Sequence, residues 1–120
     1  MVQHAKQSDL GFIVADAEDL TFSFDLDGRL TLEFIDWQQN QIKVIFKDVI
    51  GFRFQEAEYY SDEKNERLNG TYIIQESRWL SEHQSQGACS ASETYYHYKM
   101  NFNAAGICEV LSSSFEVAAN

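Results

Sequence analysis

The feature that most constrains the fold is the alternation of apolar and polar residues on both sides of Asp27-Gly28. Apolar residues occupy every second position before and after this dipeptide, at Leu20, Phe22, Phe24 and Leu26 and then at Leu30, Leu32 and Phe34. A period of two places alternate side chains on opposite faces of a strand. Asp-Gly between two such runs favours a tight turn with positive φ at both residues. We therefore expect an antiparallel hairpin with one face on the core.

Similar runs follow along the chain. Apolar alternation or clustering predicts further strands near residues 42–46, 50–54, 72–80, 94–102 and 107–117, with a bend at Ser112-Ser113-Ser114. No segment has the helical period that a parallel crossover would need. The chain is therefore predicted to be all-β and mainly antiparallel, with about seven strands in a sandwich or small barrel and little helix.

The 120 residues match the size of one domain, and 1–120 is interpreted as a single domain. Two segments lack any periodicity: residues 1–9 are expected to be loose, and residues 81–93, which are small and polar, to form a flexible loop. The short apolar run within residues 10–19 fits either a strand or a helical turn.

The charge restricts the partners. The formal net charge is −10, from 19 acidic and 9 basic residues, which disfavours nucleic acid and anionic membranes as partners. Between Asp9 and Asp36 there are eight acidic residues and one base, Arg29. Such a region can attract a basic protein. The candidate contact surface consists of Asp16, Glu18, Asp19, Asp25 and Glu33.

The two cysteines indicate neither a disulfide framework nor a metal site. Cys108 lies in an apolar strand, where a buried free thiol is expected, and Cys89 lies in the polar loop. The N-terminal residues lack the apolar stretch of a signal peptide, and no run is long enough for a membrane helix. A cytoplasmic location is therefore expected. No motif indicates a cofactor or a metal.

One pair of residues has catalytic potential. If the last two strands pair through the turn at 103–106, Glu109 comes close to His97, and a carboxylate can orient an imidazole for acid-base chemistry. The same pair can also be a stabilising contact. These two residues belong to a candidate aromatic and polar cluster that contains Tyr59, Tyr60, Trp79, Tyr95, His97 and Glu109.

The region from Phe46 to Val117 resembles a group of small bacterial domains. The residues that carry the resemblance are Trp79, His97-Tyr98 and Glu109-Val110-Leu111. Some of those domains are immunity proteins of polymorphic toxins. The resemblance implies a compact cytosolic protein that neutralises a partner by contact, and it carries over no catalytic residue.

Three functions follow from these observations. The first is a non-enzymatic protein-binding module, and the chain is accordingly expected not to be an enzyme. The alternative is a sandwich or barrel that holds a small apolar ligand in a cavity of at least ~300 Å³. The third is a hydrolase-type enzyme that uses His97 and a carboxylate. A homodimer formed through sheet edges is a further alternative.

Overall fold

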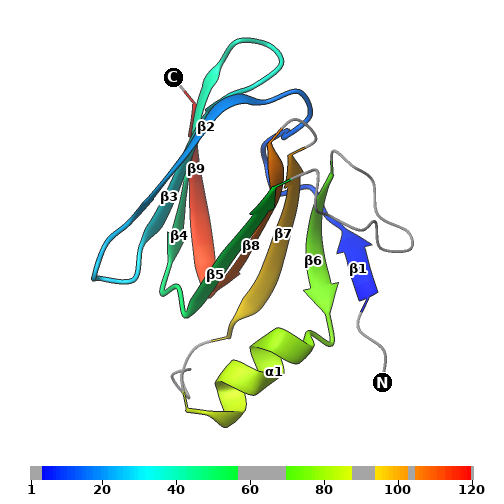
Figure 1. Cartoon of the computed structure of the whole chain (residues 1–120), viewed down its shortest axis with the longest axis vertical. Helices are drawn as coiled ribbons and strands as arrows, with labels where there is room; N and C mark the ends of the chain where they lie inside the picture. The colour runs from blue at the N-terminus through cyan, green and yellow to red at the C-terminus, as the bar shows by residue number, and fades with distance from the viewer. Residues whose placement is uncertain (1–3, 57–69, 88–93, 103–104, 120) are drawn as a thin grey trace.

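The computed structural model describes residues 4–56, 70–87, 94–102 and 105–119, and it confirms the all-β, antiparallel prediction (Figure 1). Its elements, in chain order, are β1 (His4–Gln7), β2 (Glu18–Phe24), β3 (Leu30–Ile35), β4 (Gln41–Lys47), β5 (Gly51–Glu56), β6 (Thr71–Gln75), α1 (Arg78–Ser85), β7 (Tyr96–Phe102), β8 (Gly106–Ser112) and β9 (Ser114–Ala119).

The strands form two sheets that pack face to face as a sandwich. One sheet has the order β1-β6-β7-β8-β5 and the other has the order β2-β3-β4-β9. Alternate residues of β3, β4 and β7 point between the sheets, where Phe34 meets Phe102 and Phe46 meets Tyr98 at ring-centroid distances of 5.3 and 5.5 Å. The apolar alternation in the sequence therefore marks the faces that build the core.

The hairpin between β2 and β3 forms with the predicted pairing, Phe22 opposite Leu32 and Phe24 opposite Leu30. Its turn differs from the prediction, because only Gly28 has a positive φ, at 82°. The amide of Asp25 donates to the Arg29 carbonyl (3.0 Å), so the loop contains three residues rather than two. The Asp25 carboxylate stabilises this loop by accepting from the Asp27 and Arg29 amides at 3.0 and 3.2 Å.

A corner joins the two sheets. The chain passes from β4 to β5 through Asp48, Val49 and Ile50, beside the point where β8 passes into β9 at the predicted Ser112–Ser114 bend. The three residues 48–50 lie opposite only two residues, Ser112 and Ser113, so the ladder contains a bulge here. The Ser112 hydroxyl donates to the Lys47 carbonyl (2.6 Å), and the Ser113 hydroxyl donates to Asp48 Oδ2 (2.7 Å).

The predictions for two segments, the loose N-terminus and the flexible loop, were wrong in part. Residues 4–7, expected to be loose, form β1, because they gain backbone hydrogen bonds from β6, far away in the sequence. Residues 81–85, expected to belong to a flexible loop, lie in α1, which also replaces the end of the predicted strand toward Leu80. Ser77 caps this helix, and Gln86 and Gly87 form a turn after it. Residues 88–93 of the predicted loop lie outside the described residues.

Residues 10–17 form neither a strand nor a helix. They form an irregular segment that buries Leu10, Phe12, Val14 and Ala17 in the core. Cys108 is buried and free, as predicted. Within the described residues, no helix has the length and hydropathy needed to cross a bilayer.

Candidate functional site

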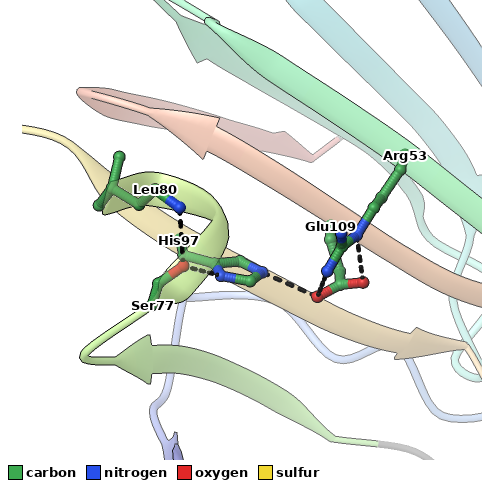
Figure 2. Close-up of polar contacts among 5 residues, drawn as sticks. All are labelled: Arg53, Ser77, Leu80, His97 and Glu109. Atoms are coloured by element: carbon green, nitrogen blue, oxygen red, sulfur yellow. Dashed lines mark hydrogen bonds and ion pairs between the residues drawn. The ribbon is translucent and has the colours of Figure 1, made fainter. Parts of the chain in front are cut away.

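Four side chains form a chain of hydrogen bonds on the outer face of the five-stranded sheet; we call it the polar relay (Figure 2). Ser77 Oγ lies 2.7 Å from His97 Nδ1, and His97 Nε2 lies 2.8 Å from Glu109 Oε1. Arg53 binds both oxygens of Glu109, through Nε at 2.9 Å and Nη2 at 3.2 Å. His97 and Ser77 are almost completely buried, whereas the side chain of Arg53 is half exposed, so the relay runs from the interior of the protein to its surface.

The charge of Glu109 determines the direction of the hydrogen bonds that end on its oxygens. Burial alone would raise the pKa of this carboxyl, but hydrogen bonds from His97 and Arg53 and their charges outweigh burial and lower the pKa to about 2. The ionised carboxylate only accepts, so His97 Nε2 must carry a proton. In the neutral ring, Nδ1 then accepts a hydrogen bond from the Ser77 hydroxyl, whose oxygen also accepts from the Leu80 amide at 3.0 Å.

The helix α1 and three strands position these groups. His97 is on β7 and Glu109 on β8, while Arg53 on β5 lies directly opposite Glu109 in register. Ser77 is held because its side chain is the N-cap of α1. Two residues later, Trp79 packs edge-on against the His97 ring (5.2 Å between centroids), and the Arg53 guanidinium lies 4.1 Å from the Trp79 ring centroid.

Gly51 makes room for Trp79. A Cβ atom on Gly51 would lie 2.9 Å from Trp79 Cζ2 and 3.1 Å from Leu111 Cδ1, closer than ordinary van der Waals contact. Only a glycine lets the indole ring rest on β5. The position of α1 over the relay therefore depends on this residue.

A groove leads to the relay. It has a volume of about 500 Å³. It lies where the β6–β7 pairing ends, at Ile73 opposite Tyr98. Apolar and aromatic side chains share the lining with Ser77 and His97, among them Ile74, Leu80, Tyr95 and Tyr96. The hydroxyl and imidazole of the relay thus border a space that can hold a small organic group.

The predicted aromatic and polar cluster is brought together in part. Trp79, His97 and Glu109 lie in or against the relay, and the predicted contact between His97 and Glu109 is present. Tyr95 is buried and lines the groove. Tyr59 and Tyr60 lie outside the described residues.

The five acidic residues of the predicted contact surface are all exposed and lie on or next to the four-stranded sheet. Asp16 precedes β2, Glu18 and Asp19 are its first two residues, and Asp25 follows it. Glu33 is on β3, opposite Thr21 of β2. Glu33 has Lys43 as a distant ion-pair partner at 3.9 Å. This arrangement leaves most of the negative charge facing solvent.

Beside these acids lies a second surface feature, formed by Phe22, Phe24, Phe52 and Phe54; we call it the aromatic edge. It spans the outermost strands β2 and β5 of the two sheets. Phe22 contacts Phe52 and Phe54 at centroid distances of 5.3 and 5.2 Å. Phe24 is 55% exposed and Phe52 and Phe54 are each 37% exposed, with the fully exposed Leu26 at the hairpin tip.

Sequence reasoning did not find Arg53 or Ser77 as members of the relay. The alternation of β5 signalled that Arg53 is on the face opposite its phenylalanines, but not which residue it meets. Ser77 stands just before Arg78-Trp79-Leu80, and a serine before a helix is a capping signal. That signal was missed because α1 was interpreted as a strand end and a loop.

Two grooves lined by described residues bear on the ligand-binding alternative. The groove at the relay is lined by β6, α1 and the start of β7, and a second groove of about 350 Å³ is lined by β2, β3 and β4. Each is lined by residues of one sheet rather than of both. Neither groove therefore supports the predicted ligand cavity between the two sheets, which stays a prediction.

Within the described part of the chain, no group of three or more His, Cys, Asp or Glu side chains is arranged to hold a metal ion. Comparisons of the chain with protein-family models, with curated proteins and with solved structures found no match. The resemblance to immunity proteins therefore stays a prediction, and function must be argued from the site itself.

Proposed function

We propose that the protein is a protein-binding module and that the aromatic edge is the centre of its contact surface. The observation that carries this proposal is the exposure of Phe24, Phe52 and Phe54 on two outermost strands, which meet where the Phe22 ring contacts the rings of Phe52 and Phe54. Exposed apolar patches with a polar rim are typical of protein interaction sites. Aromatic residues are also enriched at the centres of interfaces.

The surrounding charge favours a basic partner. Glu18 and Asp19 lie at one end of β2 and Asp25 and Asp27 at the other, so carboxylates flank the aromatic edge along the strand. Complementary charge raises the association rate, whereas buried aromatic contacts supply most of the binding energy. We therefore expect the affinity to decrease when Phe24 is truncated, and the association rate to decrease when salt rises.

Photo-cross-linking in the cells that produce the protein tests this proposal. A benzophenone amino acid replaces Phe24 or Phe54 and, as the control, Trp37, which is 53% exposed at the tip of the next hairpin and thus matches Phe24 in exposure. We expect one basic protein to be cross-linked from positions 24 and 54 and not from 37. Equal cross-linking from all three positions, or none from 24 and 54, would contradict the proposal.

A quantitative measurement follows with the purified partner. Phe24→Ser should weaken binding at least about tenfold, the cost of truncating an interface hot spot. Asp27→Lys with Glu33→Lys should mainly slow association and reduce its salt dependence. Asp25 is left unchanged in this test, because its carboxylate holds the hairpin loop and a lysine there would alter the fold as well as the charge.

A second candidate function is ester or amide hydrolysis at the polar relay. It is favoured by the hydrogen bonds that join Ser77, His97 and Glu109, since a nucleophile, a base and a group that orients the base are the parts of acyl-transfer sites. Ser77 Oγ would attack a substrate carbonyl while His97 Nδ1 takes its proton. The proton would then pass to the leaving group, and water would release the acyl group by the reverse sequence.

A fluorophosphonate probe tests the second candidate, because it reacts with activated serine hydroxyls. Ser77→Ala should abolish labelling, whereas Ser81→Ala, an exposed serine in the same groove, should not. His97→Asn should reduce the labelling rate by at least about a hundredfold, the usual contribution of a general base. An unlabelled wild-type protein would limit the relay to holding α1 on the sheet.

A further inference from the structure

The backbone of β2 offers hydrogen bonds on the side away from β3. Asp25 and Arg29 are a hydrogen-bonded pair, with 3.0 Å between the Asp25 amide and the Arg29 carbonyl oxygen. Such pairs alternate along an antiparallel ladder, so Ser23 opposite Thr31 is the next one. The N–H and C=O groups of Phe22 and Phe24 therefore point outward. Among the residues that the structure describes, no strand pairs with this side of β2.

Most proteins protect such an edge. Lysine, proline or a bulge in the outermost strand usually prevents pairing with another chain. β2 has an irregularity between Glu18 and Thr21, but its remaining residues, Phe22-Ser23-Phe24, contain none of these devices. The open backbone also coincides with the aromatic edge, since the same two phenylalanines supply the outward amides and the exposed rings.

We infer that β2 receives an extended segment of a basic partner as an additional antiparallel or parallel strand. The backbone groups of Phe22 and Phe24 pair with that segment, and its apolar side chains cover Phe24 and the rings of β5. This inference rests on the proposed function and specifies the partner segment: extended, with alternating basic and apolar residues.

Charge selects this occupant over a second copy of the chain. Each copy has a formal charge of −10, and the eight acids against one base between Asp9 and Asp36 lie in the segment that contains β2. Two such edges would repel each other. A lysine-rich strand would instead place its ammonium groups near Glu18, Asp19 and Asp27, which are exposed at the two ends of β2.

A synthetic peptide tests the inference on the full chain. The probe is an acetylated, amidated heptapeptide in which lysine and valine alternate. A second peptide replaces lysine by glutamate. A third and a fourth carry N-methyl groups on one or the other set of alternate residues, and each therefore lacks the donors on one edge of the peptide. Binding is followed by amide chemical shifts and by the hydrogen exchange of the Phe22 and Phe24 amides.

The lysine peptide should protect these two amides, whereas the glutamate peptide should not bind. Of the two N-methylated peptides, one for each edge, one should bind about thirtyfold more weakly, as expected for two lost hydrogen bonds of ~1 kcal/mol each. Phe24→Pro removes the outward donor and should abolish protection at Phe22, whereas Phe24→Ser should weaken binding but retain that protection.

Two results with the peptides would overturn the inference. One is binding of the lysine peptide at the phenylalanine side chains with unchanged exchange of both amides. The other is equal affinity of all N-methylated peptides. Either result leaves the proposed function intact if position 24 still cross-links the cellular partner. Failure of the cross-linking itself, with the peptide bound, would refute the proposed function and not the edge chemistry. Dimerisation of the chain through β2, seen in sedimentation, would also overturn the choice of occupant.

Discussion

Replacing Glu109 by Gln is expected to destabilise the fold in a strongly pH-dependent manner. The folded state lowers the pKa of this carboxyl from 4.5 to about 2. Because one pKa unit corresponds to ~1.4 kcal/mol, the ionised group adds about 3 kcal/mol to the free energy of unfolding at pH 7. Gln keeps the size of the side chain but cannot be ionised, so Glu109→Gln should lose about 3 kcal/mol at pH 7.

The sign of the pH dependence follows from the direction of the shift. A lowered folded-state pKa gives stability that is complete above the unfolded pKa of 4.5 and is lost as the pH falls toward 2. The difference between wild type and Glu109→Gln should therefore be constant from pH 7 to about 5. It should fall to about 1.4 kcal/mol at pH 3 and to about 0.4 kcal/mol at pH 2.

Urea unfolding at a series of pH values, followed by tryptophan fluorescence, measures this difference. Glu33→Gln is the control, because its 3.9 Å contact with Lys43 is solvent-exposed and should contribute less than about 1 kcal/mol. Two parallel stability profiles for wild type and Glu109→Gln down to pH 2.5 would refute the reasoning. They would show that the loss comes from packing and not from the charge of Glu109.

Three further substitutions test other parts of the structure. Gly51→Ala places a Cβ atom 2.9 Å from Trp79 Cζ2, so we expect a loss of about 1–3 kcal/mol and a shifted Trp79 emission in a Trp37→Phe background; an unchanged spectrum would argue against the packing of α1 on β5. Asp25→Ala removes the acceptor for two loop amides and should cost about 1 kcal/mol in urea unfolding, whereas Asp25→Asn, which keeps Oδ1, should cost less; equal losses would count against this role. Gly106→Ala should lower the free energy of unfolding by at least about 3 kcal/mol, because φ is 149° and the added Cβ would overlap the Gln55 carbonyl oxygen. The control Gly87→Ala, with φ 77° and no atom within 4 Å, should lower it by about 1 kcal/mol, and similar thermal midpoints for the two variants would contradict the clash.

The parts of the fold that follow local rules could be predicted from the sequence. The register of β2 with β3 follows from apolar alternation on both arms, since a slip by one residue would expose Leu30, Leu32 and Phe34. The turn itself was missed in detail, because Asp-Gly fits both a two-residue loop and a three-residue loop. The side chain of Asp25, which accepts from two amides, favours the longer one.

In the candidate site, too, only the residues with a local signal in the sequence could be predicted. His97 and Glu109 could be placed together because the connection between β7 and β8 is short, and a short connection fixes the register of the two strands. Lys99 lies opposite Glu109, and His97 is the diagonal neighbour of Glu109. Arg53 reaches Glu109 from 56 residues away, and no local signal specifies that β5 pairs with β8. Ser77 required recognition of a helix of 8 residues with no buried side chain, for which the apolar pattern is weak.

The corner at Ser112–Ser114 has a consequence for how the sandwich opens. The segments β4–β5 and β8–β9 form one bent antiparallel ribbon that belongs to both sheets. Separating the sheets would require the Lys47 carbonyl to leave the Ser112 hydroxyl and the ribbon to straighten. Neither sheet can therefore detach as an independent subglobal unit, and the amides of Val44 and Val110 should become accessible only in the same global opening event.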